Sequence, residues 1–259
     1  MGSEYRFPNI IGHSEAIRRI FILMNRAIET DVDILITGET GTGKDLVARE
    51  IHSHSRREDK DLFAINCGAF SKEMLFSKLF GYRKGAFKGA IADKAGLFEI
   101  TGDGTLILDD VDQIPLDIQL DVVNVIVERK IQRMGEYTLR DVYMRVVAIS
   151  NQDLPGVVET GCFREDFYNR LKAFHIHLPP LRERPEDIPL LAEHFYEQLC
   201  HQTPVAPQGF GPGVMEMLQR YSWPGNVLEL RNEIRQAFML VQHGKEIRKH
   251  HFSSQISNK

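Results

Sequence analysis

The chain has 259 residues, of which 42% are hydrophobic and 26% charged, and its formal net charge is −4. This composition is ordinary for a soluble globular protein, and the charge argues against a nucleic-acid binder whose whole surface is basic, while a local basic patch stays compatible with it. No apolar run approaches the roughly 18 residues that span a membrane, and the three cysteines show no zinc-site spacing. We therefore expect a cytoplasmic protein with one large domain and one smaller one.

The first element that the sequence predicts is an amphipathic helix over residues 17–28. Its apolar residues recur at helical spacing and indicate a packed face. Ile10-Ile11-Gly12 precedes it, ahead of the first predicted strand. In P-loop domains the segment in this place often lines the adenine pocket, so Ile10, Ile11 and Gly12 are candidate nucleotide contacts.

A glycine-rich loop follows a predicted strand at 32–37 and precedes a predicted helix that ends near residue 54. Its glycines let several backbone N–H groups point inward at phosphate oxygens, and the helix N-terminus and Lys44 add positive charge. An ordinary flexible turn would not explain a lysine beside the last glycine. Asp45 stands where Ser or Thr usually ligates Mg²⁺, and it would hold the metal through water. The predicted triphosphate site consists of Gly38, Glu39, Thr40, Gly41, Thr42, Gly43, Lys44 and Asp45.

A second apolar strand, predicted over residues 104–110, ends in two carboxylates. Downstream of a P-loop, this pattern predicts that Asp109 holds Mg²⁺, directly or through water, and that Asp110 orients or deprotonates the attacking water. Taken alone, the pair would fit a surface turn equally well. Another predicted strand, 142–150, ends in Ser150 and Asn151, polar groups in a place suited to sensing a γ-phosphate.

Two further strands are predicted, at 63–66 and 174–178. The second alternates, and we assign His175 and His177 to its polar face rather than to a metal site. Strands separated by helical segments predict an α/β fold with a parallel sheet and crossover helices.

The pattern changes after Pro179-Pro180, and only helical spacing follows. We therefore expect two domains, a nucleotide-binding domain over 5–184 and a helical domain over 185–259. The helices of the second domain are predicted at 188–199, 215–221 and 227–241, with a Pro- and Gly-rich loop over 203–213.

Together these segments resemble the AAA+ domain of bacterial enhancer-binding transcription activators, which act with sigma-54. The resemblance covers nearly the whole chain and implies an AAA+ P-loop NTPase fold, an αβα sandwich with a five-stranded parallel sheet and a small helical lid. Besides the two nucleotide motifs, it rests on Phe80-Gly81, Gly85-Ala86-Phe87-Lys88-Gly89-Ala90, the segments 161–171 and 179–188, and Trp223-Pro224-Gly225-Asn226-Val227.

The resemblance also implies roles for single residues, with ATP and Mg²⁺ as cofactors. Asn66 matches the residue that restrains the catalytic carboxylate, and an acidic residue at position 45 is usual in this family. Arg164 and Arg170 match arginines that reach a neighbour's γ-phosphate, which implies a ring and, by analogy, a hexamer. A pair of surface salt bridges is the alternative for these arginines.

Three positions depart from the family pattern. Lys88 replaces the threonine of GAFTGA, the loop that touches sigma-54, and Tyr82-Arg83-Lys84 raises the loop to three positive charges. Asp110 stands where the family has a catalytic Glu, and its side chain reaches about 1.5 Å less far. A displacement of ~1 Å at a reacting centre can cost on the order of 10²-fold in rate. Leu228 stands where the family has an arginine in the lid, and the lost charged hydrogen bond to the nucleotide would cost roughly 1.5–3 kcal/mol. Arg231, one helical turn further on the same face, is the residue that could replace it.

These departures favour the ATP-binding module of a transcription regulator that forms a ring and acts on RNA polymerase or its sigma factor, with slow or residual hydrolysis. Promoter DNA would bind through a domain outside this sequence, and no membrane contact is expected. One alternative is a fully active ATPase that remodels sigma-54 polymerase. A second is a regulator independent of sigma-54 that responds to cyclic di-GMP, although Pro8, His194 and Gln198 stand where that site has an arginine and a Glu-x-x-x-Arg pair.

Overall fold

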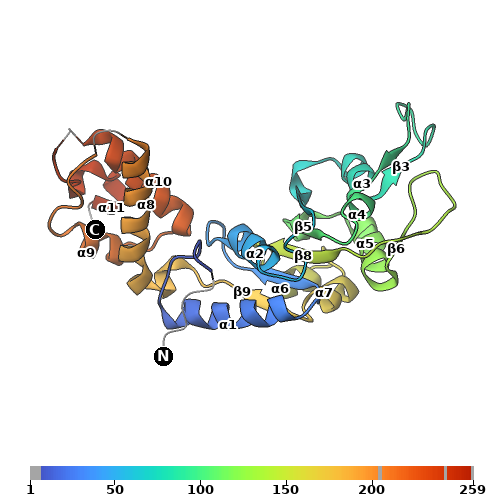
Figure 1. The fold of residues 1–259 in the computed structure, drawn as a ribbon, viewed down its shortest axis with the longest axis horizontal. Coiled ribbons are helices and arrows are strands. Elements are labelled where there is room, and N and C mark those ends of the chain that lie inside the picture. The colour runs from blue at the N-terminus through green and yellow to red at the C-terminus, as the bar shows by residue number, and fades with distance from the viewer. Residues whose placement is uncertain (1–6, 204–205, 242–243, 258–259) are drawn as a thin grey trace. The chain divides into compact units, whose positions relative to one another are not determined.

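The computed structural model describes residues 7–203, 206–241 and 244–257 (Figure 1). The chain divides into two compact units. The first consists of residues 23–37 and 47–177, and the second of the residues up to 22, 38–46 and those from 178 onward. The sequence predicted one boundary, between residues 184 and 185. Within the structure, the glycine-rich loop and the N-terminal segment group with the C-terminal helices, and the predicted boundary stays a prediction.

A parallel five-stranded sheet forms the centre of the first unit, as predicted, with the strand order β2-β5-β8-β1-β9. The middle strands are continuous apolar runs because a parallel sheet is covered on both faces. β8 begins at Arg145, later than the predicted Val142. The bounds are Ile34–Thr37 for β1, Leu62–Asn66 for β2, Thr105–Asp109 for β5, Arg145–Ser150 for β8 and His175–His177 for β9.

Helices of this unit pack against one face of the sheet (Figure 1). The core there joins alternate strand residues such as Leu106 and Val146 to Phe98, Val122 and Phe167 of the helices. The helices are α3 (Lys72–Phe80), α4 (Leu97–Ile100), α5 (Leu116–Glu128), α6 (Leu154–Glu159) and α7 (Glu165–Leu171), while α1 (Glu15–Glu29) and α2 (Lys44–Ser53) have residues in both units. Short 3₁₀ turns cover Cys67–Ala69, Val111–Gln113, Leu181–Glu183, Pro185–Asp187 and Lys249–His251.

Two antiparallel hairpins that the sequence did not predict interrupt the first unit. One pairs β3 (Gly81–Tyr82) with β4 (Lys94–Ala95), and the other pairs β6 (Lys130–Ile131) with β7 (Arg140–Asp141). We call residues 83–93 the first hairpin loop and residues 132–139 the second hairpin loop. Both extend from the same end of this unit in Figure 1, and Met134 joins them: its carbonyl accepts the Arg83 N–H (2.9 Å) and its N–H donates to Gly81 (3.1 Å).

The second unit has its own core, built by α8 (Ile188–Gln202), α9 (Val214–Arg220), α10 (Asn226–Leu240) and α11 (Ser254–Ser257). Trp223 is fully buried at its centre, and its indole N–H donates to the Leu218 carbonyl at 2.7 Å. Leu230 and Ile234 of α10 belong to the same core. The predicted C-terminal helical region is confirmed. No helix within the described ranges is long and apolar enough to cross a membrane.

Candidate functional site

The glycine-rich loop, residues 38–44, follows β1 directly and ends where α2 begins. Gly38, Gly41 and Gly43 have φ values of +147°, +81° and +104°. Gly41 is the most constrained, because a Cβ there would lie 2.3 Å from the Gly225 carbonyl oxygen. At the N-terminus of α2, the first backbone N–H groups lack helical partners and carry the positive end of the helix dipole. The loop therefore has the backbone of an anion-binding site.

Lys44 supplies a positive charge inside this loop. Its side chain is only 9% exposed, and the ammonium donates to the carbonyls of Gly38 (2.7 Å) and Glu39 (2.9 Å). Thr42 accompanies it, with its hydroxyl on the Glu39 carbonyl at 2.8 Å. The ammonium is thus held within the curve of the backbone, next to the amides of α2.

The start of α10 contacts the same loop. Asn226 is buried, with φ +53°, and its side-chain amide donates to Glu39 (3.1 Å) and to the Thr40 carbonyl (3.0 Å). Its side-chain oxygen accepts the Leu181 N–H at 2.7 Å. Arg182 adds a bidentate ion pair with Glu39 at 2.8 and 2.6 Å. These contacts join the Trp-Pro-Gly-Asn motif to the loop, although the two stand far apart in the sequence.

A buried arginine, Arg184, and a buried aspartate, Asp187, make further contacts near the loop. Arg184 is 3% exposed and donates to the Thr42 carbonyl at 3.2 Å, and burial lowers the pKa of its guanidinium. The Asp187 carboxylate accepts N–H groups of His13 (2.7 Å) and Ser14 (2.8 Å) and the Ser14 hydroxyl (2.6 Å). Asp187 thereby fixes the segment that carries Ile10, Ile11 and Gly12, the predicted adenine contacts.

Position 228, rather than Arg231, lies against the loop. The Leu228 N–H donates to the Gly41 carbonyl at 3.3 Å, and the Leu228 Cβ lies 3.1 Å from where a Cβ at Gly41 would stand. Arg231 is exposed on α10, and its side chain forms no hydrogen bond or ion pair within the described part of the chain. The structure thus gives no support for Arg231 as a substitute for the missing lid arginine.

In the first unit, the polar residues predicted at the strand ends gather at the carboxyl edge of the sheet. Asn66 lies opposite Asp109 in the register of β2 and β5. The Asn66 amide donates to one Asp110 oxygen at 2.7 Å, and the Asn151 amide to the other at 3.4 Å. Asp110 has φ +51°, a left-handed conformation that aspartate tolerates better than most residues. The carboxylate of Asp110 is therefore held between two amides.

Ser150 has a different partner from Asn151. Its hydroxyl donates to Asp112 at 2.5 Å, a carboxylate that the sequence had not singled out.

His175 and His177, at the same edge, both contact the Thr37 hydroxyl, at 2.7 and 2.9 Å, and burial lowers the pKa of His175. No group of three or more potential metal ligands of the His, Cys, Asp or Glu type gathers within residues 7–203, 206–241 and 244–257.

The two candidate trans-acting arginines lie at opposite ends of α7, and each pairs with a carboxylate. Arg164 forms a bidentate, exposed pair with Asp166 at 3.0 and 2.7 Å. Arg170 donates to Asp33 at 3.2 Å, and that carboxylate is 4% exposed. One arginine is therefore held by an exposed neighbour in sequence, and the other by a buried and distant residue.

The candidate partner segment, residues 85–90, forms the tip of the first hairpin loop. It closes through hydrogen bonds from the Gly85 N–H to the Ala90 carbonyl (2.8 Å) and from the Ala90 N–H to the Phe87 carbonyl (3.0 Å). Phe87 is 41% exposed, and Lys88 is exposed beside it. Of the three positive charges predicted for the loop, Arg83 is already paired, with Asp93 and Glu136.

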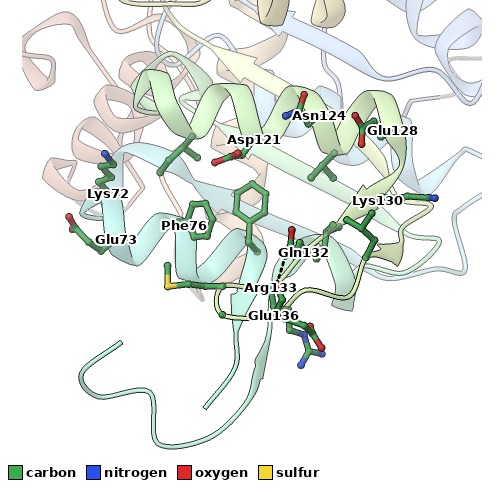
Figure 2. Close-up of a pocket in the computed structure, with 17 residues that line it drawn as sticks. Lys72, Glu73, Phe76, Asp121, Asn124, Glu128, Lys130, Gln132, Arg133 and Glu136 are labelled. Carbon is green, nitrogen blue, oxygen red and sulfur yellow. Dashed lines mark hydrogen bonds between the residues drawn. The ribbon is translucent and has the colours of Figure 1, made fainter. Parts of the chain in front are cut away.

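A groove of about 580 Å³ lies between α3, α5 and the residues after β6 (Figure 2). Phe76 and Phe80 of α3 line it, with their stacked ring centroids 4.4 Å apart, and Asp121 projects into it from α5. Burial, with a smaller contribution from the Asp117 charge, raises the pKa of Asp121. None of the predicted nucleotide residues lines this groove.

Comparison with known proteins identifies the family. The family described as the sigma-54 interaction domain matches residues 10–177. The chain belongs to this family. A second family, described as the AAA+ ATPase lid domain, matches residues 182–259 of the chain. The predicted family and fold class, the AAA+ domain of the sigma-54-dependent type of transcriptional activator, are therefore confirmed.

Relatives of this sigma-54 interaction domain include bacterial transcription regulators. It is 43% identical over 240 residues to the DNA-binding transcriptional activator HyfR of Escherichia coli K12, covering 93% of this chain and 36% of HyfR. It is 40% identical over 227 residues to the transcriptional regulator NtrC of the same organism, covering 88% and 48%. The NtrX structure of Brucella abortus with ADP superposes with a TM-score of 0.88 at 32% identity, covering 96% and 56%. The chain thus spans about half or less of these relatives' length.

Several residues of the site were not predicted from the sequence. Arg182, Arg184 and Asp187 contact the loop or its neighbours, and their only signal was the Arg-Glu-Arg-Pro run after the double proline. Asp112 and Thr37 carried no signal, because their partners come from other strands.

Proposed function

We propose that this chain is the ATP-binding module of a bacterial transcription regulator that assembles into a ring and acts on RNA polymerase at promoters, with slow or residual ATP hydrolysis. The observation that supports nucleotide binding is the loop at 38–44, where a Cβ at Gly41 would lie 2.3 Å from the Gly225 carbonyl oxygen and the Lys44 ammonium is held by loop carbonyls. NtrX of Brucella abortus, similar over 96% of this chain, was solved with ADP and with ATP, which supports the same ligand class.

The proposal includes a magnesium ion beside that nucleotide. Mg²⁺ prefers oxygen ligands and is usually bound by one or two carboxylates together with phosphates and water. Asp109, at the end of β5, would hold it, and Asp45, next to the loop lysine, would hold it through water. The bound ion would offset the negative charge of the phosphates.

Asp110 is the proposed base, or water-orienting residue, of hydrolysis. The amides of Asn66 and Asn151 each donate to one of its oxygens, which fixes the carboxylate but also limits how far it can move. An aspartate reaches about 1.5 Å less than a glutamate, and a misplacement of ~1 Å can cost on the order of 10²-fold in rate. Leu228 against the loop, in place of an arginine, removes a charged hydrogen bond worth roughly 1.5–3 kcal/mol. Both features favour slow turnover.

Ring assembly is proposed from Arg164 and Arg170. Arginines of this kind contribute when they reach a phosphate held by a neighbouring subunit, and such contacts can contribute ~10³- to 10⁵-fold in rate. Guanidinium groups suit this role because they remain charged and bind phosphate with parallel N–H donors.

The first hairpin loop is the proposed contact with RNA polymerase or its sigma factor. Phe87 and Ile91 are 41% and 85% exposed there, and the Lys84 and Lys88 ammonium groups form no ion pair within the described residues. An apolar surface ringed by positive charge fits a partner with acidic and apolar residues. Promoter DNA would be bound by a part of the protein outside this sequence.

Turnover measured across protein concentration tests the proposal, with Lys44→Ala as the blank. We expect slow hydrolysis whose specific rate rises with concentration as the ring forms. Brisk turnover, together with activation of sigma-54 transcription, would favour the fully active remodelling ATPase instead. Absence of both ATP binding and turnover at every concentration would refute the proposal. Cyclic di-GMP, the second alternative, is added in the same assay, and a change in assembly would favour it.

A further inference from the structure

Asp33 is a buried carboxylate shared by two arginines. It lies just before β1, and its side chain is 4% exposed. One oxygen accepts the Val146 N–H at 2.9 Å, and the other accepts Arg129 at 2.9 Å and Arg170 at 3.2 Å. Neither Asp33 nor Arg129 has a part in the proposed nucleotide chemistry. A buried charge that is fixed by a strand amide and paired twice has a definite position in the fold.

Arg170 uses only one terminal nitrogen, Nη2, for this pair in the described part of the chain. Its other N–H groups remain available to a ligand, and the side chain is 40% exposed. A guanidinium has donors on more than one edge, so it can keep Asp33 on one edge and offer another to a phosphate. Anchoring one edge also removes rotamer freedom that the long side chain would otherwise lose on binding.

Arg164 provides an internal comparison. Its partner Asp166 is two residues away, and both side chains are more than one third exposed. Exposed pairs of this kind contribute little and orient a side chain weakly. Arg129, in contrast, also donates to the Met144 carbonyl at 2.9 Å and keeps Asp33 paired independently of Arg170. The anchor of Arg170 is thus rigid and does not depend on Arg170 itself.

We propose that Asp33 is a positioning residue for Arg170: it holds one edge of the guanidinium so that the remaining donors face the phosphates of a nucleotide bound by a neighbouring copy. This inference rests on the proposed function, because it needs a ring in which Arg170 acts in trans. The predicted loss when the anchor is removed is that of a misplaced group, on the order of 10²-fold in turnover.

The test uses mixtures of variants, because a trans-acting group can be supplied by another subunit. Single-turnover hydrolysis of labelled ATP is measured for Asp33→Asn, for Arg170→Ala and for each mixed with Lys44→Ala. The Lys44→Ala copy binds no nucleotide but carries an intact Asp33 and Arg170. Arg129→Ala is the matched control, since it removes the other arginine and leaves Arg170 on Asp33. Asp33→Glu keeps the charge but shifts it, and serves if Asp33→Asn does not fold.

We expect Asp33→Asn to bind ATP like the parent chain, to lose about 10²-fold in turnover, and to recover on mixing as Arg170→Ala does. Arg129→Ala should keep turnover close to that of the parent, because Arg170 stays on Asp33. Parental turnover in Asp33→Asn would overturn the inference. A loss that mixing fails to restore, while Arg170→Ala is restored, would show a merely structural role and overturn it as well. Parental turnover in Arg170→Ala would instead refute the trans arginine of the proposed function, and this inference with it.

Discussion

Gly41→Ala should weaken ATP binding without unfolding the protein. The residue has φ +81°, and a side chain in the left-handed region costs roughly 1–2 kcal/mol. Its Cβ would also lie 2.3 Å from the Gly225 carbonyl oxygen, below the 3.0 Å that real contacts of this kind respect. Backbone on one side must therefore move by about 0.7 Å, the difference between these two distances. The free loop can relieve this strain by moving, and ATP binding restores it, so about 1–2 kcal/mol converts to a 5- to 30-fold rise in the Kd of ATP.

Titration calorimetry with ATP and Mg²⁺ measures this effect, and thermal unfolding of the same samples reports stability. Gly102→Ala is the matched control, because Gly102 also has positive φ (+57°) but lies outside the loop, and a Cβ there would meet no atom within 4 Å. It should lower the Tm while leaving the Kd unchanged. A folded Gly41→Ala variant that binds ATP with the parental Kd would refute the role of the loop backbone.

Three further outcomes are expected. Asp110→Glu combined with Leu228→Arg should raise steady-state ATP turnover by at least about tenfold, from the restored reach and the restored charged hydrogen bond; unchanged turnover would mean that these departures do not limit hydrolysis. Cys67 is 1% exposed and burial raises the pKa of its thiol, so iodoacetamide at pH 8 should label the exposed Cys162 in the native protein and spare Cys67, as peptide mass spectrometry would show. Burial raises the pKa of Asp121 above its ordinary value of 3.8, so the folded protein keeps this proton to a higher pH than the unfolded chain does. The free energy of unfolding therefore falls as the pH rises from 3.8 through the pKa of the folded state. Asp121→Asn should therefore raise the Tm at pH 7 and lose this advantage below pH 3.8, and a Tm gain independent of pH would contradict the assignment.

The sequence predicted the sheet well because its signal is local. Continuous apolar runs such as Ile34-Leu35-Ile36 are typical of a strand covered on both faces, and the glycines and lysine after them indicate a phosphate loop. The helices of the C-terminal unit were equally predictable, because apolar residues recur on one face.

The hairpins and the buried polar partners could not be predicted in the same way. β3 consists of Gly81–Tyr82 alone, too short for any alternation, and its loop is joined to Met134 through hydrogen bonds between distant segments. Asp187 binds Ser14 across 173 residues, and Asp33 binds Arg170 across 137. Such pairings depend on how the strands and helices bring the chain together, and neither partner carries a local pattern that names the other.

Site residues with a local sequence pattern could be predicted, and those that depend on contacts between distant segments could not. Gly41 was predicted because a backbone that curls around phosphate needs glycine at a known spacing. The place of position 228 near the nucleotide was implied only by the family resemblance, and the structure adds that Leu228, rather than Arg231, contacts Gly41.

Calorimetric titration of the parent chain and of Lys44→Ala with ATP and Mg²⁺ tests the central claim most directly. The account predicts a saturable heat of association with one nucleotide per chain in the parent, and its loss in Lys44→Ala, whose fold is checked by thermal unfolding. No heat in the parent, or the same binding isotherm in both proteins, would contradict it.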